Sequence, residues 1–290
     1  MNNNFIKNND TVRVKVVRNK VILHNINTCN RRATIKRIGG GRHINVRTGE
    51  IVEETRQVKR GDSMYSLIES NLKLQDIIKE NTINTDHILF ITLTYAQKIF
   101  DIKKVNEDFK VFMKWLRRNI TEFGTIEYIS TVALHSDKTS YHIHTILFFN
   151  ESTKSVFIPF ETIEKAWQRG CASIGKPKRN RDVYFYLTPH LSNDVTDKNS
   201  HMHKNALLQM ELPAGQNLYH CSKGIKKPII HTDTYENIKK YLKENSYELE
   251  NEQIYLNPMK AHRGNNLYYC KETYKKEETK SYGLGKRTPI

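Results

Sequence analysis

Two stretches of the chain follow the alternation that extended strands require. Residues 87–95 alternate apolar side chains with polar and aromatic ones, and residues 141–149 are rich in β-branched and aromatic residues between two polar segments. Both patterns predict strands, at residues 88–95 and 141–149. Because side chains two residues apart in a strand share a face, each pattern also determines which side chains line a common surface.

His142 and His144 lie two residues apart in the second predicted strand, so their imidazoles share a face. Two neighbouring imidazoles on a mostly apolar strand suit the chelation of one divalent cation. The same spacing also fits two histidines that are hydrogen-bonded to neighbours on a half-exposed strand. A further strand is predicted at residues 127–135, and its short polar connection to the histidine strand indicates a hairpin. That hairpin can bring His135 near the pair as a third nitrogen ligand.

Helix-forming patterns identify the segments that pack against these strands. They predict helices at residues 62–81, 105–120, 160–169 and 235–245. We expect an α+β fold in which helices pack on one face of an antiparallel sheet and the histidines lie on the other. Residues 1–60 are expected to form a basic N-terminal β extension or small β subdomain, and residues 61–290 the main domain.

The charge balance indicates the kind of partner. The chain carries 47 Lys and Arg residues against 31 Asp and Glu residues, a net charge of +16 at pH 7. Such an excess favours a polyanionic partner, most often nucleic acid. No apolar run approaches the roughly 18 residues of a membrane span, the N-terminal segment lacks a signal-peptide core, and the cysteines are far apart. We therefore expect reduced thiols, a cytoplasmic location and no membrane partner.

Hydroxyl and basic side chains are the candidate contacts to nucleic acid. Thr92 and Thr94 share one face of the first predicted strand, where hydroxyls suit a surface that meets a ligand. A basic loop supplies four further candidates, namely Lys176, Lys178, Arg179 and Arg181.

Five stretches occur in an order that carries more information than each alone. They are Phe90–Tyr95, Val105–Arg118, His142-Ile-His144, Trp167–Gly170 and Tyr219–Pro228. This order, over about residues 60–270, resembles the rolling-circle replication initiators of small phages and plasmids, the HUH endonucleases. The filamentous-phage type of replication-associated protein is the most similar branch. The resemblance implies a ferredoxin-like arrangement of the sheet, with His142 and His144 in the metal-binding motif.

The resemblance also implies a reaction: metal-dependent, site-specific nicking and joining of single-stranded DNA through a 5′-phosphotyrosine intermediate. The family's nucleophile is a tyrosine in a motif with two tyrosines and two lysines. Here Tyr186 keeps the first tyrosine, His190 stands where the second would be, and both lysines are missing. Tyr186 is therefore the first candidate for the nucleophile, and Tyr241, which has basic neighbours, is the second.

The implied cofactor is a divalent metal ion, Mn²⁺ or Mg²⁺, that polarises the phosphate. The implied partners are single-stranded or origin DNA and a host helicase, since the chain has no phosphate-binding loop of an ATPase. Two alternatives remain open. One is a catalytically degenerate protein that binds single-stranded or origin DNA on the same fold, and the other is a related transposase or relaxase.

Overall fold

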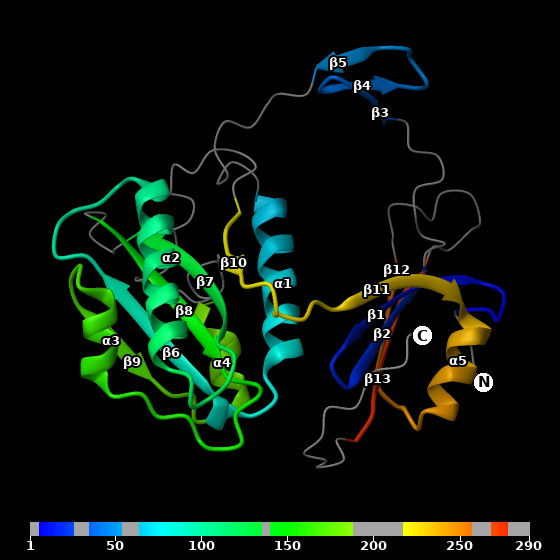
Figure 1. The fold of residues 1–290 in the computed structure, drawn as a ribbon. Coiled ribbons are helices and arrows are strands. Elements are labelled where there is room, and N and C mark those ends of the chain that lie inside the picture. The colour runs from blue at the N-terminus through cyan, green and yellow to red at the C-terminus, as the bar shows by residue number, and fades with distance from the viewer. Residues whose placement is uncertain are drawn as a thin grey trace. The chain divides into compact units, whose positions relative to one another are not determined.

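The computed structural model (Figure 1) describes residues 6–25, 35–53, 64–134, 140–187, 217–256 and 268–277 of the chain. The chain divides into two compact units. The central unit comprises residues 56–227, and the terminal unit comprises residues 1–55 together with residues 228–290. The expected boundary at residue 60 lies close to the first division. The division at residue 228 was not expected from the sequence.

The described part of the central unit contains α1 (Met64–Asn81), the 3-10 turn η2 (Thr85–His87), β6 (Ile88–Thr94), α2 (Ile102–Asn119), β7 (Glu127–Leu134), β8 (Tyr141–Phe148), α3 (Phe160–Trp167), β9 (Ala172–Gly175), α4 (Asn180–Leu187) and β10 (His220–Cys221). Five of its strands form an antiparallel sheet in the order β10-β7-β8-β6-β9. The succession β6-α2-β7-β8-α3-β9 with this strand order is the ferredoxin-like arrangement. The predicted α+β class with an antiparallel sheet is thereby confirmed.

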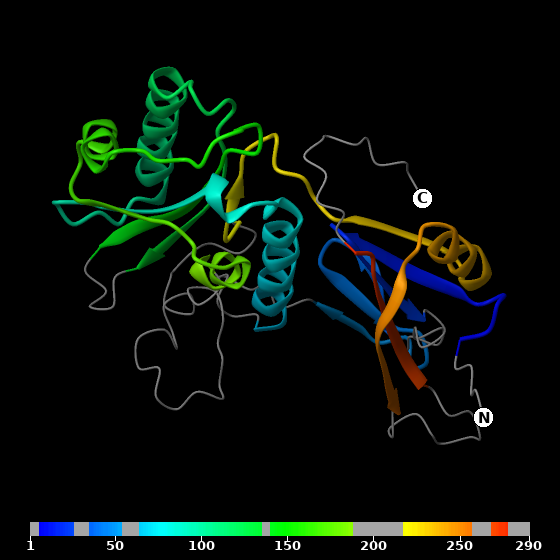
Figure 2. The same ribbon diagram turned by 90° about the horizontal axis from the view of Figure 1, so that it is seen from below.

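Helices cover both faces of this sheet, whereas the sequence predicted helices on one face. Figure 2 shows α2 and α3 on one face and α1 and α4 on the other. The physical reason lies in β8, which is buried at all eight of its positions. Ile146 and Phe148 share the histidine face and are fully buried, so this face also needs apolar cover.

The helix α2 follows directly from its sequence. Asp101 caps it by accepting hydrogen bonds from the amides of Lys103 and Lys104, so the helix begins three residues before the predicted start. Its buried stripe includes Val105, Phe109, Phe112 and Leu116 at helical spacing.

A buried carboxylate joins the end of β6 to both helices of the ferredoxin-like layer. Asp108 of α2 is 2% exposed and forms ion pairs of 2.8 Å with Lys104 and Arg169. It also accepts a hydrogen bond from the Tyr95 hydroxyl, at 3.2 Å. Burial alone would raise the pKa of Asp108, but the hydrogen bonds from Lys104 and Arg169 outweigh it and lower that pKa.

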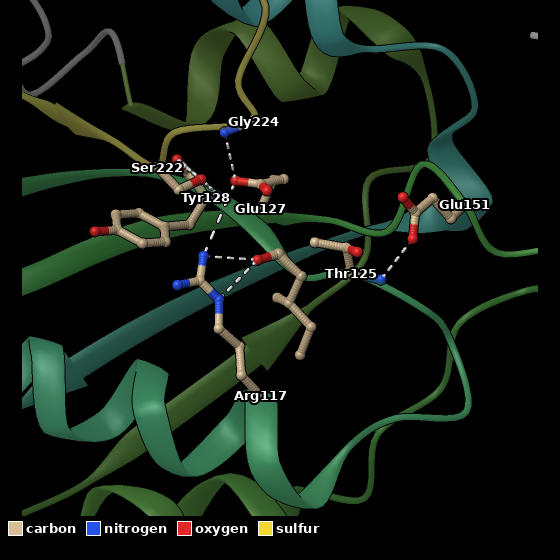
Figure 3. Close-up of polar contacts among 8 residues, drawn as sticks. Arg117, Thr125, Glu127, Tyr128, Glu151, Ser222 and Gly224 are labelled. Atoms are coloured by element: carbon tan, nitrogen blue, oxygen red, sulfur yellow. Dashed lines mark hydrogen bonds and ion pairs between the residues drawn. The ribbon is translucent and has the colours of Figure 1, made fainter.

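The stretch that leads into the terminal unit is fastened to the first residues of β7 (Figure 3). The backbone amide of Ser222 donates to the Tyr128 carbonyl at 3.0 Å, and the Tyr128 amide donates to the Ser222 hydroxyl at 2.7 Å. The Gly224 amide donates to the Glu127 carboxylate at 3.1 Å. Arg117 of α2 donates to the Ile126 carbonyl at 2.9 and 3.1 Å. A stretch resembling the family is thus the edge strand β10 and its turn.

The described part of the terminal unit contains β1 (Thr11–Val17), β2 (Lys20–Asn25), β3 (Ile35–Gly39), β4 (Arg42–Asn45), β5 (Ile51–Glu53), β11 (Ile229–Thr234), α5 (Tyr235–Glu244), β12 (Glu248–Leu256) and β13 (Tyr268–Lys275). Its larger sheet has the order β11-β1-β2-β13-β12, and β3, β4 and β5 form a smaller one. The N-terminal strands β1 and β2 therefore pair with strands from the C-terminal end of the chain. Their hydrogen bonds to β11 and β13 make these residues one unit rather than an extension.

A glycine sets the closest approach between β6 and the segment after α3. A Cβ added to Gly170 would lie 2.3 Å from the Thr94 carbonyl oxygen and 2.5 Å from the Ala96 amide nitrogen. Both are backbone atoms, and the Trp167 indole also donates to the Thr94 carbonyl, at 2.8 Å. Only glycine allows this contact without moving the strand.

We predict that Gly170→Ala lowers the free energy of unfolding by about 1–3 kcal/mol, because the added methyl group meets backbone that cannot yield. Gly175→Ala is the matched control, since its Cβ would lie 3.9 Å from the Phe90 Cβ, an ordinary contact. Urea unfolding followed by circular dichroism compares the two variants. Equal stability of both would contradict this account of the approach.

Candidate functional site

The two histidines of β8 point in the same direction and touch. Their Nε2 atoms are 2.7 Å apart, and their ring centroids are 4.6 Å apart at an interplanar angle of 80°. Each residue is 8% exposed. The shared face that the sequence predicted for His142 and His144 is therefore present in the fold.

Strand pairing determines what surrounds the pair. In the register of β6, Thr92 lies opposite His144 and Thr94 lies opposite His142. In the register of β7 on the other side, Thr131 lies opposite His144 and Ala133 lies opposite His142. The pair is thus flanked by small and hydroxyl-bearing side chains, which leave the imidazoles as the most basic groups on this part of the sheet.

Tyr186 lies next to the histidines, on α4. Its ring stacks on Phe90 of β6 with centroids 4.2 Å apart and an interplanar angle of 5°. The same ring meets His144 edge to face, with centroids 5.6 Å apart at 88°. Helix α4, which the sequence analysis did not predict, thus brings a phenol beside the imidazoles.

A line of hydrogen bonds connects the phenol to the pair. The Tyr186 hydroxyl is 2.8 Å from Thr92 Oγ1, which in turn is 3.0 Å from His144 Nδ1. His144 continues the line through its Nε2 contact with His142. Thr92, which the sequence suggested as a DNA contact, therefore joins the two candidate catalytic groups.

Burial raises the pKa of Tyr186 to about 12, although its hydrogen bond to Thr92 acts in the opposite direction. The phenol is therefore fully protonated near neutral pH. As a nucleophile it would need a nearby positive charge, or a base, to favour the phenolate.

The geometry of the pair fits a divalent metal ion. Two imidazole nitrogens each about 2.1 Å from one ion, with an angle of about 90° at the ion, lie roughly 3 Å apart. The separation of 2.7 Å between the Nε2 atoms is close to that value. Imidazole nitrogens suit Mn²⁺ and later metals better than Mg²⁺. His142 and His144 therefore fit a metal ion with little rearrangement.

The tautomers are constrained by the same contacts. When His144 Nδ1–H donates to Thr92 Oγ1, His144 Nε2 carries a lone pair, and the Thr92 hydroxyl hydrogen is available to Tyr186. Metal-binding histidines generally have such an outer partner on the other ring nitrogen. Without a metal, the short contact requires His142 Nε2–H to donate to His144 Nε2. Metal binding at both nitrogens releases that proton.

A third protein ligand is not found beside the pair in the described ranges. His135, the predicted third ligand, lies outside the described residues, and Ala133 offers no donor atom. Within the described parts of the chain, the only three-residue group of His, Cys, Asp or Glu with metal-ligand spacing is Glu252, Cys270 and Glu272, in the terminal unit. Glu272 there accepts hydrogen bonds from the Tyr235 and Tyr274 hydroxyls.

The predicted DNA contacts fall into two groups. Thr92 and Thr94 lie on the histidine face, and the Thr94 hydroxyl donates to the Cys171 carbonyl at 3.0 Å. The basic loop connects β9 to α4, the helix of Tyr186. In it, Lys176 pairs with Asp86 at 3.3 Å and Arg179 pairs with Asp182 at 3.1 Å, while Lys178 is exposed. The side chain of Arg181 lies outside the described residues.

The second candidate nucleophile is not part of this arrangement. Tyr241 lies on α5 in the terminal unit, where its ring packs near Tyr247 with centroids 6.2 Å apart. Sequence reasoning missed Phe90 as the stacking partner of Tyr186. The alternation of β6 contained the signal, because Phe90 and Thr92 are two residues apart and share a face.

Comparison with known proteins supports one assignment. Residues 88–194 match a family of replication-associated proteins, described as the ORF2 type. The matched region spans the ferredoxin-like strands, both histidines and Tyr186, and supports a replication initiator protein. No curated protein and no solved structure matches the chain. Among the described helices, none is long and apolar enough to cross a membrane.

Proposed function

We propose that this protein initiates rolling-circle DNA replication by nicking and rejoining a single DNA strand, with Tyr186 as the nucleophile and His142 and His144 as metal ligands. One observation carries the proposal. A phenol, a threonine hydroxyl and two imidazoles from β6, β8 and α4 form one hydrogen-bonded line. The family match over the same residues agrees with a role in replication.

The reaction is a transesterification at phosphorus. The Tyr186 oxygen forms a bond to the phosphorus atom, and the bond from phosphorus to the 3′ oxygen breaks. The phenol loses its proton and the released 3′ oxygen gains one, so the strand ends as a 5′-phosphotyrosine and a free 3′-hydroxyl. Attack by that hydroxyl, or by another 3′-hydroxyl, reverses the step and joins the strand without ATP.

The residues of the chain have separate parts in this reaction. His142 and His144 would hold a divalent ion, which supplies charge to the phosphate oxygens. Thr92 fixes the tautomer of His144 and directs its own hydroxyl hydrogen toward the Tyr186 oxygen as negative charge develops there. Lys178 and the neighbouring basic loop would contact phosphates of the bound strand.

One feature favours a second candidate function, a catalytically degenerate DNA-binding protein on the same fold. Tyr186 is packed on Phe90, and its pKa is raised to about 12, as expected for a structural tyrosine. The experiments on the histidines and on Tyr186 separate the two functions. The relation to transposases or relaxases depends on which DNA is cut.

The double variant His142→Ala plus His144→Ala should lose nicking of a random-sequence single-stranded DNA library in Mn²⁺, by about 10³-fold or more, because both ligands are removed. Its salt-sensitive DNA binding should remain. His43→Ala plus His231→Ala, in the terminal unit, is the matched control. Cleavage by the first double variant at the wild-type rate refutes the metal assignment.

Thr92→Val should weaken Mn²⁺ binding by about 10–100-fold, the usual effect of losing an outer partner of a metal-bound histidine. Thr92→Ser keeps the hydroxyl and should bind Mn²⁺ nearly as well as the wild type. Thr94→Val removes a hydroxyl that bonds elsewhere on the same strand and serves as the control. Calorimetric titration measures all four proteins, and identical affinities would disprove the coupling.

Tyr186→Phe should abolish the covalent protein–DNA adduct seen on denaturing gels, while Tyr241→Phe should form it normally. In the wild type, adduct formation should accelerate about tenfold per pH unit between about pH 7 and pH 9, since the phenolate is the reactive form of a group whose pKa lies well above this range. An adduct that persists in Tyr186→Phe would remove this residue from the reaction.

A further inference from the structure

The larger sheet of the terminal unit has two unlike faces. One face is apolar and carries Val12, Val14, Val21 and Leu23, which pack against α5. The residues between them along β1 and β2 therefore point to the opposite face. Arg13 is exposed on that face, and Lys15 and His24 are partly exposed.

Strand register aligns the side chains of this second face into rows that cross all five strands. One row runs Thr232, Arg13, His24, Lys271 and Gln253. The next row runs Ile230, Lys15, Ile22, Thr273 and Asn251. Neither row contains a carboxylate. We name Arg13, Lys15, His24 and Lys271 the basic sheet face.

Electrostatics shows that these charges act on one another. The pKa of His24 is lowered to about 4, first by burial and then by repulsion from Lys271, Lys15 and Arg13. Like charges opposite one another in neighbouring strands lower the stability of a sheet. The fold therefore retains an arrangement that is unfavourable in the isolated protein, and an anionic ligand would relieve it.

Carboxylates that belong to the same sheet lie toward its other end. Glu250 pairs with Lys20 at 2.5 Å, and Glu248 lies opposite Lys275 in the register. Lys20 and Lys275 are thus provided with acidic neighbours within the sheet. The other members of the two rows that hold the basic sheet face are neutral, so positive potential concentrates there.

We propose that the basic sheet face is a second nucleic-acid-binding surface, which binds the phosphates of single-stranded DNA. Lysine and arginine supply the charge, and Thr232, Gln253 and Asn251 add the hydroxyl and amide groups that commonly contact phosphate and sugar. The surface lies in a different unit from the histidine site and does not depend on nicking. An anionic membrane is a poorer match, because the rows are flat and carry no protruding aromatic side chain.

The test uses the full chain without divalent cations, so that the histidine site makes no chemical contribution. The triple variant Arg13→Gln, Lys15→Gln and Lys271→Gln should bind a fluorescent single-stranded oligonucleotide about tenfold more weakly at moderate salt. Its log–log salt dependence should become less steep by about 2, since each single-strand phosphate contact contributes about 0.7. The variant should be at least as stable as the wild type, because repulsion is removed.

The matched control is Lys7→Gln, Lys240→Gln and Lys243→Gln, which removes the same charge from exposed positions away from this face. It should change the affinity and the salt dependence only slightly. Equal losses in the two triple variants would show that only net charge matters and would overturn the proposal. Binding of phosphatidylserine vesicles in place of DNA would overturn it as well.

A second readout reports the face directly. Nuclear magnetic resonance of labelled histidine, with the signal assigned through His24→Gln, follows the pKa of His24. The bound oligonucleotide should raise that pKa by about one pH unit or more, because phosphates offset the three neighbouring cations. No change at saturating oligonucleotide would contradict the proposal, whatever the outcome of the nicking experiments.

Discussion

The antiparallel register between β6 and β8 is the constraint on which the candidate site depends. It places Thr92 beside His144 and Thr94 beside His142. A slip of one residue would turn both histidines into the layer of α2 and α3, where Ile143 and Leu147 now lie buried. The apolar side chains of both faces fix this register, since neither face of β8 can be moved to water without large loss of burial. The chemistry is thus determined by the core.

Helix α4 adds what the ferredoxin-like part lacks. The sheet and its helices α2 and α3 position the imidazoles, but the phenol comes from a separate helix on the opposite face. The stacking of Tyr186 on Phe90 fixes its ring, and Thr92 fixes its hydroxyl. Such support from packed and hydrogen-bonded neighbours is what a reacting group requires, because a displaced nucleophile loses most of its rate.

Much of the central unit was predictable, because its signals are local. The alternation in β6 and β8 and the apolar stripe of α2 each lie within one short segment. Helix α4 was missed because Val183-Tyr-Phe-Tyr-Leu187 consists of residues that favour strands, and tertiary packing overrode that preference. The terminal unit was missed for a different reason. Its sheet pairs β1 with β11, more than 200 residues apart, and no local pattern reports such pairing. The role of Thr92 needed the register, which only the fold supplies.

The central claim is that His142, His144 and Tyr186 form one metal-assisted site. The most direct measurement is anomalous diffraction at the manganese edge from crystals soaked with Mn²⁺ and a short single-stranded oligonucleotide. The account predicts one strong peak in contact with the Nε2 atoms of both histidines, with a phosphate bound next to the Tyr186 hydroxyl. A peak only at Glu252, Cys270 and Glu272, or histidines that keep their mutual hydrogen bond with no metal beside them, would contradict it.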